Sequence, residues 1–586
     1  MVGNYIYGFT VTLLLAWLAG FPIAVLCGVG RGARAIGFAS ACGTSLLLIV
    51  CRGVQMISPL APAKWMLLSA LLLMIAFAWT RRSTRAAWGE LWQADGRVLV
   101  AVIGAAAIVG VLLGVPILFG GAIQYDGTRN ADSFTFTQSA QYMLGHAFYG
   151  AADFTPEHPV YTISRGYFGH GATQPRPAAE GLLAWISALR GVDPMYLYNA
   201  LQAAGVVLAG LAALAFLPRE WQARGAKDWL LLVVYAQGCP ALLHIAANSN
   251  FANAFNLPSA AAYVALGLLP RTRGTFIAGA LCIGCLLSGY PELLVFVAMA
   301  RGLGVMLEGW MTRRIGAVIR EAGWMIGELV LACALLPWAA WGAIAVFETT
   351  LGISHEGASG LGGNMFAGLP MFMAAAIALA VAWRALGTMP DAGRRWFLAA
   401  ILIAFGVAQG LMLARGFDYG GFKVSQYFAT LLIGVVIRSV LSTPVGIKPG
   451  RASGAVAVTL SIMMLLKSAD VLRRAWGWSD ARRVTPDLVA AGRDLARLSH
   501  GLPVVLGSTP QAYYYGMWVP YVASVPIAFD LIRDADAAGY LSPYLRLAGR
   551  EPALLNVAPL RLEIATDESG GAAPVARYGQ VVIRPK

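Results

Sequence analysis

The stretch VLVAVIGAAAIVGVLLGVPILF, residues 98–119, contains 22 residues and no charged side chain. A helix of about 20 such residues spans the hydrocarbon core of a bilayer. Similar stretches recur along most of the 586-residue chain, in which 58% of residues are hydrophobic and 12% are charged, with a mean hydropathy of +0.66. Soluble domains carry charge on about a quarter of their residues. The sequence therefore excludes an ordinary soluble protein and predicts an all-α polytopic membrane protein.

The lengths of the apolar stretches predict about fourteen membrane crossings. We place them near residues 5–28, 36–51, 65–79, 98–119, 197–217, 229–246, 255–270, 275–289, 292–308, 322–346, 369–387, 396–414, 424–441 and 453–468.

The formal net charge of +14 arises mainly from short Lys and Arg clusters between these stretches, which favours membrane orientation over nucleic-acid binding as its cause. The clusters fall in alternate gaps, and cytoplasmic loops are the ones enriched in Lys and Arg. The N-terminus, the loop 120–196 and the tail from about 470 are therefore expected outside the cytoplasm. Arg301 does not fit this pattern, because it lies within a predicted crossing. The clusters are Arg31 with Arg34, Arg81 with Arg82 and Arg85, Arg219 with Arg224 and Lys227, Arg271 with Arg273, Arg313 with Arg314, Arg394 with Arg395, and Lys448 with Arg451.

The composition changes at about residue 470, which predicts a transmembrane domain over 1–469 and a small external α/β domain over 470–586. Leu488, Ala491, Leu495 and Leu498 lie at helical spacing. Strands are predicted over 502–506, 560–565 and 580–584.

The loop 120–196 carries its own helix and several short motifs. Asp132 precedes Phe136, Ala140, Met143 and Leu144, an apolar stripe at helical spacing that opens with a capping residue. AQYMLG (140–145), QPRP (174–177) and GVDP (191–194) follow. This order resembles the first external loop of the GT-C superfamily, the membrane glycosyltransferases that use polyprenyl-phosphate-linked sugars. Members of that family usually place the loop after their first span, whereas about three further spans precede it here.

The resemblance implies an inverting transfer of a hexosyl or pentosyl group to a glycan, lipid-linked or protein acceptor on the outer face of a bacterial inner membrane. A carboxylate at the membrane surface would take the proton of the acceptor hydroxyl. Asp132 aligns best with this base, and Asp126 is the second choice. The alternatives are that Asp132 only caps a helix and that Asp126 with Gly127 only forms a turn.

The segment RGFDYGGFKVSQYF (415–428) supplies cations at the external end of a span. By resemblance, Lys423, Arg415 and Tyr419 are expected to bind the lipid phosphate of the donor, since phosphate binding needs charge and directed N–H groups. The alternative is that Arg415 and Lys423 only reach toward lipid headgroups.

Further residues are possible substrate contacts. Tyr290 and Glu292 interrupt an apolar stretch in SGYPE (288–292), which is either a polar site in the membrane or a tight turn with Glu292 capping the next helix. His355 and Glu356 lie in a Gly-rich loop that is either a lid or a solvated segment. The first loop adds Arg165, His170 and Arg176.

No cofactor is required by these motifs. Some GT-C members hold a divalent cation between acids, and Asp126, Asp132 and Glu292 could do so here. The chain contains no Walker motif or dinucleotide fingerprint, so neither ATP-driven transport nor use of a nucleotide sugar is supported. Two other functions stay open: a membrane transporter or flippase, and a polymerase or ligase of lipid-linked glycans.

Overall fold

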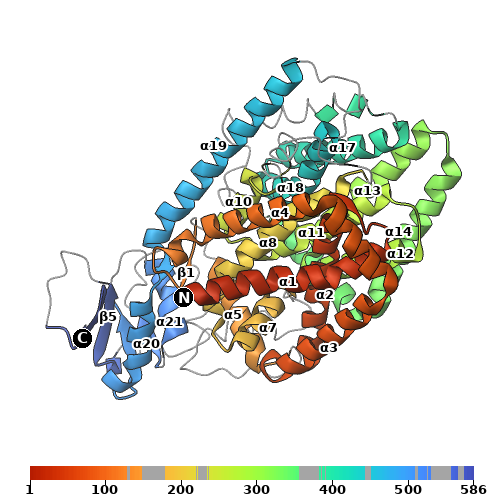
Figure 1. Ribbon diagram of the computed structural model, residues 1–586. Coiled ribbons are helices and arrows are strands. Elements are labelled where there is room, and N and C mark those ends of the chain that lie inside the picture. The colour runs from red at the N-terminus through yellow and green to blue at the C-terminus, as the bar shows by residue number, and fades with distance from the viewer. Residues whose placement is uncertain are drawn as a thin grey trace.

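The computed structural model describes residues 1–127, 132–147, 178–218, 221, 232, 234, 236–355, 382–383, 386–387, 389, 391–441, 451–507, 512–523, 525–529, 556–564 and 573–586. Within these residues, eight helices are long and apolar enough to cross a membrane. Most of them run roughly side by side in one bundle (Figure 1). They are α1 (Val2–Leu26), α2 (Gly32–Ile57), α3 (Leu60–Thr80), α4 (Arg82–Leu118), α8 (Tyr198–Ala212) with its extension η2 (Ala213–Phe216), α13 (Pro291–Met311), α17 (Ala392–Ala414) and α18 (Asp418–Leu441).

Helices α1 and α2 approach each other closely because glycines face each other at their contact. A Cβ atom on Gly43 would lie 1.6 Å from the carbonyl oxygen of Ala16, and one on Gly20 would lie 1.8 Å from that of Ala39. Small residues at helix contacts let backbones pack directly, which is how membrane helices gain dispersion energy without a hydrophobic driving force.

The centre of the bundle is formed by α8 and α11 (Phe251–Ala265), whose side chains are buried along most of both helices. The short helix α10 (Pro240–Ala247) precedes α11, and η3 (Leu266–Leu268) extends it. Helix α12 (Arg273–Gly289) begins with a capping box between Thr272 and Thr275, in which each side chain bonds the backbone N–H of the other residue.

The segment predicted as one crossing over 322–346 is broken. Helix α14 (Ile315–Leu335) and helix α15 (Pro337–His355) meet at an angle of 104°. Pro337 has no N–H to donate and disfavours a helical conformation for Leu336, so a continuous helix cannot form here.

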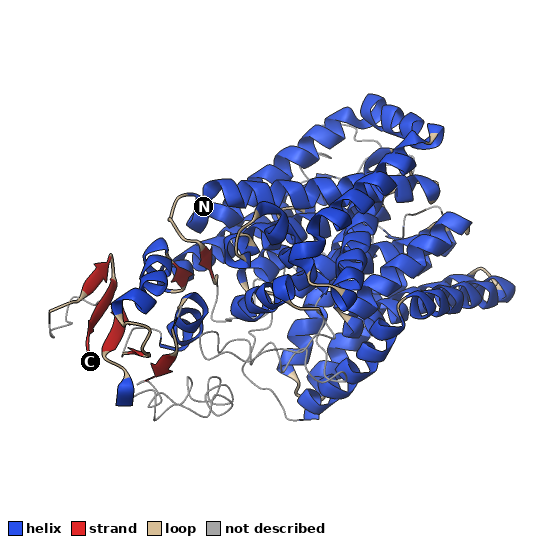
Figure 2. Ribbon diagram, turned by 90° about the horizontal axis from the view of Figure 1, so that it is seen from below, coloured by secondary structure: helices blue, strands red, loops and turns tan. Residues whose placement is uncertain are grey.

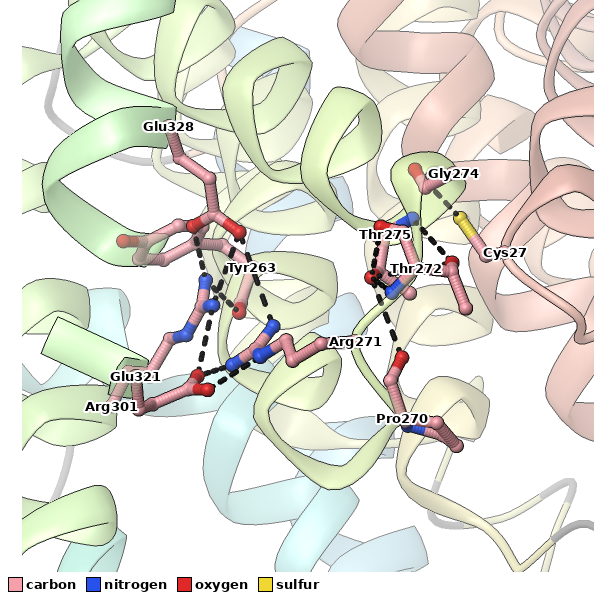
Figure 3. A network of polar contacts seen from close by, with 10 residues as sticks. All are labelled: Cys27, Tyr263, Pro270, Arg271, Thr272, Gly274, Thr275, Arg301, Glu321 and Glu328. Carbon is pink, nitrogen blue, oxygen red and sulfur yellow. Dashed lines mark hydrogen bonds and ion pairs between the residues drawn. The ribbon is translucent and has the colours of Figure 1, made fainter. Parts of the chain in front are cut away.

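A buried charge network anchors α14 to the bundle (Figure 3). The guanidinium of Arg301 in α13 bonds both carboxylate oxygens of Glu328, at 2.9 and 3.2 Å, and lies 4.3 Å from the ring centre of Tyr263. Arg271 pairs with Glu321, the second carboxylate of α14. Arg301 and Glu328 are both fully buried. The pairing explains how a predicted crossing tolerates Arg301, since charges within membranes persist where they pair with one another.

A layer of short helices, which the charge pattern predicts to be external, lies at the end of the bundle where the chain begins. It contains α5 (Asp132–Gly145), α7 (Ala178–Arg190) and the single turn η1 (Pro194–Tyr196). Arg190 donates a hydrogen bond to Asn4 at 3.1 Å, so α7 lies beside the N-terminus. The N-terminus, α5, α7 and the C-terminal strands all lie at the same end of the molecule (Figure 1). Their placement on one side of the membrane stays a prediction.

The last long helix, α19 (Arg451–Ala481), continues past residue 470 and leads into the C-terminal domain. A five-stranded sheet forms there in the order β4-β3-β5-β7-β6, with β3 parallel to β4 and β5, and β7 antiparallel to β5 and β6. The sheet projects from one end of the helical part (Figure 2). Strand β2 (Arg483–Val484) does not belong to this sheet. The other elements of the C-terminal region are α20 (Pro486–Leu498), β3 (Val504–Leu506), α21 (Ala512–Val522), β4 (Ile527–Phe529), β5 (Leu560–Ile564), β6 (Ala576–Tyr578) and β7 (Val581–Pro585).

The predicted fold class, a helical membrane protein with a small C-terminal α/β domain, is confirmed. The predicted helix at Asp132 is α5, and the three predicted C-terminal strands correspond to β3, β5 and β7. Eight of the predicted crossings correspond to the eight long apolar helices named above. Segments 255–270 and 275–289 form the shorter helices α11 with η3 and α12, while 453–468 is part of α19. Much of 229–246 and 369–387 lies outside the described residues.

Candidate active site

The loop that follows α4 is held in place on both sides of Asp126. The backbone N–H and C=O of Tyr125 bond the side-chain amide of Asn199, at 3.1 and 3.0 Å. Strand β1 (Gln124–Tyr125) pairs antiparallel with β2, and the N–H of Asp126 donates to the carbonyl of Arg482 at 3.0 Å. The position of the Asp126 backbone is therefore fixed by partners from α8 and from the segment after α19.

Ser249 contacts the Asp126 carboxyl from the turn between α10 and α11. Its hydroxyl donates to Oδ1 of Asp126 at 3.1 Å, and its carbonyl accepts from the Tyr198 hydroxyl at 3.4 Å. Ser249 has a φ of 54°, a left-handed conformation that is uncommon outside glycine. Such conformations cost energy and persist where the surroundings impose them. Here the conformation accompanies the contact between the Ser249 hydroxyl and the carboxyl.

Asp126 is fully buried, and burial raises the pKa of its carboxyl from 3.8 to about 7. The hydroxyls of Ser133 and Ser249 and the charge of Arg482 oppose this rise, whereas the nearby Asp132 adds to it. A carboxyl with a pKa near the working pH is well suited to take and release a proton. The two acids of the sequence prediction therefore lie together, with Asp126 buried and Asp132 half-exposed at the start of α5.

Lys423 is linked to this carboxyl site by a contact with Asn250, the residue that follows Ser249. Its ammonium donates to Oδ1 of Asn250 at 3.3 Å. One turn further along both helices, the amide nitrogen of Asn253 donates to Oε1 of Gln426 at 2.6 Å. The two contacts form successive bridges between the start of α11 and helix α18, because residues three apart share a helix face.

These bridges leave hydrogen-bond donors without acceptors. Both amide oxygens are occupied, while Nδ2 of Asn250 and Nε2 of Gln426 are buried and have no partner among the described residues. A buried donor without a partner costs about 1–3 kcal/mol. Asn250 also stands at the N-terminus of α11, where the helix dipole favours an anion. Lys423 and the two amides are thus a donor set suited to a phosphate.

Tyr290 reaches the same helix from the turn between α12 and α13. The hydroxyl of Tyr427, one turn after Lys423, lies 3.3 Å from the hydroxyl of Tyr290. Pro291 and Glu292 form the first turn of α13, and Glu292 is buried. Residues 288–292 thus contain a turn, but Tyr290 and not Glu292 is the N-cap of α13, and the turn joins Tyr290 to the helix that carries Lys423.

The other predicted site residues lie elsewhere or outside the described part of the chain. Arg415 is exposed at the C-terminus of α17. Tyr419 lies in the first turn of α18 and His355 ends α15. Within the described residues, no group of three or more His, Cys, Asp or Glu side chains could hold a metal ion, so the divalent cation stays an expectation. Arg165, His170, Arg176 and Glu356 lie outside the described residues.

Neither a protein family model nor a curated protein matches the sequence. The chain is similar to ArnT from Cupriavidus metallidurans in its apo-state crystal structure. The TM-score is 0.45 and the sequence identity 13%, over 84% of this chain and 98% of that chain. A similarity of this degree assigns no activity, so the assignment below relies on this chain's own residues.

Several residues of this site were not predicted from the sequence: Ser249, Asn250, Gln426 and Arg482. Ser249 lies 123 residues from Asp126, and Asn250 lies 173 residues from Lys423. One local signal was available, because Asn248, Ser249 and Asn250 are three polar residues in a row at an external gap between apolar segments.

Proposed function

We propose that this protein is a membrane glycosyltransferase of the GT-C type that transfers a sugar from a polyprenyl-phosphate donor to an acceptor hydroxyl on the outer face of a bacterial inner membrane. The proposal rests on the contacts of two consecutive residues, Ser249 and Asn250. Ser249 bonds the buried carboxyl of Asp126 and Asn250 bonds Lys423. A carboxyl with a pKa near 7 and a donor set suited to a phosphate are thereby linked through two consecutive residues.

The chemistry follows from these two parts. The Asp126 carboxylate takes the proton of the acceptor hydroxyl as that oxygen attacks the anomeric carbon. The bond from the anomeric carbon to the phosphate oxygen breaks, and the departing lipid phosphate keeps the electron pair. Lys423, with the amide donors of Asn250 and Gln426, stabilises the charge that develops on this phosphate. A single displacement of this kind inverts the configuration of the sugar.

A matched pair of substitutions distinguishes the roles of Asp126 and Asp132. Asp126→Asn should lower transfer at least about a hundredfold, since a positioned base contributes that much or more. Asp132→Asn should retain most activity, because Asn caps a helix nearly as well as Asp. The assay uses proteoliposomes with undecaprenyl-phosphate-linked hexoses and pentoses and an envelope glycolipid extract, and follows labelled sugar in the product. The reverse pattern makes Asp132 the base, and two active variants exclude this mechanism.

A transporter is the alternative class, and one feature favours it. Helix α14, which ends at the break before α15, carries the buried Glu328. Interrupted helices with internal charges are typical of secondary transporters. The network, however, contains two arginines and two glutamates that pair with one another. Sugar uptake or lipid flipping in the proteoliposomes without any new glycosidic product would support the alternative.

A further inference from the structure

The segment after α19 forms part of the wall around Asp126. The N–H of Ile123 donates to the carbonyl of Val484 at 2.8 Å, and that of Asp126 donates to the carbonyl of Arg482 at 3.0 Å. Together with the β1–β2 pairing, these bonds tie the loop before Asp126 to the beginning of the C-terminal domain.

Two side chains from this part of the chain act on the Asp126 carboxyl. The guanidinium of Arg482 lies 5.5 Å from the ring centre of Trp478, and its charge stabilises the ionised carboxyl. Tyr514 of α21 is fully buried, and its hydroxyl has no hydrogen-bond partner within the described residues. Burial raises the pKa of this phenol, and the negative charge of Asp126 raises it further.

The domain is also fastened to the external layer. The hydroxyl of Tyr521 donates to Oδ1 of Asp193 at 2.7 Å, and the rings of Phe134 and Trp518 meet edge to face at 5.4 Å. Phe134 follows Asp132 by two residues on α5. The same domain that supplies Tyr514 therefore packs against the helix that carries the second acid.

We propose that the C-terminal domain is part of the active site, and that Arg482 and Tyr514 are positioning residues that hold the Asp126 carboxylate in place for proton transfer. This inference rests on the proposed function. It gives the domain a direct role in the reaction, because a base displaced by about 1 Å can lose a hundredfold in rate.

Five titratable or charged groups interact electrostatically with Asp126, and two of them come from the C-terminal part. A carboxylate surrounded by acids and phenols needs a nearby cation to remain ionised at neutral pH. Arg482 is suited to this task, and the Tyr514 hydroxyl is a donor that a carboxylate or an acceptor hydroxyl can use. The titratable and charged groups that bear on Asp126 are Tyr125 of its own strand, Asp132 of α5, Tyr198 of α8, Arg482 and Tyr514.

The test uses the full-length protein in the transfer assay, with the next residue along each segment as a control. Arg482→Gln and Tyr514→Phe should each lower kcat about tenfold, while the KM for the lipid-linked donor stays unchanged. Arg482→Lys keeps the charge and should recover most of the rate. The acid limb of the Arg482→Gln profile should move to higher pH, so that part of the loss disappears at pH 9. Arg483→Gln and Tyr515→Phe should behave as wild type, because Arg483 bonds Gly120 and its charge acts on Tyr515.

Three results decide the outcome. If Arg482→Gln and Tyr514→Phe match their controls while Asp126→Asn is inactive, this inference is wrong and the proposed function stands. If the wild type transfers no sugar, both are wrong. If Arg482→Gln fails to fold, Arg482→Lys and Tyr514→Phe carry the test, and unchanged kcat in Tyr514→Phe overturns the role of the domain.

Discussion

At the scale of single residues, the carboxyl of Asp126 is the most consequential group in the molecule. Its pKa of about 7 results from burial that two hydroxyls and one arginine only partly offset. The carboxyl therefore changes charge in the range where the protein works, and both its chemistry and its cost to folding depend on pH.

The rate of transfer should rise with pH through about 7, because only the ionised carboxyl can accept a proton. Stability should change in the opposite direction. The folded-state pKa lies above the ordinary value of 3.8, so the folded protein binds more protons between these values. The free energy of unfolding should fall across that window by up to about 4 kcal/mol. Asp126→Asn should remove this dependence and be at least as stable as wild type at pH 8, measured by thermal unfolding in detergent. A variant clearly less stable than wild type at pH 8 would contradict the assigned pKa.

Lys423→Met should weaken the use of the donor by about 1–3 kcal/mol, the range for a charged hydrogen-bond partner. Thermal stabilisation by undecaprenyl phosphate measures binding directly, with undecaprenol as the ligand that lacks phosphate. Lys64→Met is the matched control, because Lys64 lies in the N-terminal half of α3 and its ammonium is 5.8 Å from the ring centre of Trp65. If undecaprenyl phosphate stabilises Lys423→Met and wild type equally, the phosphate does not bind at Lys423.

At the scale of secondary-structure elements, helix α14 depends on charge. Its buried side chains are Glu328 and Ala332, so the pairing with Arg301 adds to a small set of apolar contacts such as that of Trp324 with Phe276. A Cβ atom on Gly279 of α12 would lie 2.4 Å from Cδ of Glu328. Because Gly279 has no side chain, the Glu328 carboxylate can occupy this space.

Arg301→Met should destabilise the protein by about 3–5 kcal/mol, because it leaves a buried carboxylate without its main partner. The double variant Arg301→Met with Glu328→Met should recover much of this loss. Arg394→Met removes an exposed pair with Asp391 and should change stability by less than about 1 kcal/mol. Thermal unfolding in detergent compares the three. No recovery in the double variant would show that the network does more than balance charge.

The elements that the sequence predicted best are those with a strong local pattern. The stripe that begins at Asp132 gives α5, and the run at Val504 gives β3, because periodicity and burial agree there. The break at Leu336 was missed because the apolar composition continues across Pro337. The site was predicted only in part: Asp126, Asp132 and Lys423 were chosen because their segments resemble those of the GT-C superfamily. Ser249, Asn250 and Arg482 become site residues only through contacts between distant segments, which no local pattern records.

At the scale of the whole molecule, the contacts place the N-terminus, α5, α7 and the C-terminal domain at one end of the bundle. Arg-rich loops are costly to translocate, so this end is expected outside the cytoplasm. Reporter fusions at Arg82 and at Lys586 should therefore report opposite compartments, the cytoplasm and the exterior. A fusion at Asn4 should agree with the one at Lys586. Agreement between the Arg82 and Lys586 fusions would contradict this orientation.

The pairing of β1 with β2 has a consequence for biosynthesis. Gln124 of β1 pairs with Val484 of β2, which is made about 360 positions later. Ribosomes add about 5–20 residues per second, so roughly 20–70 s separate the insertion of the first half of the site from the arrival of the second. A chain that lacks its last tenth to fifth would be inserted and yet inactive, so translation itself would delay turnover until each molecule is nearly finished.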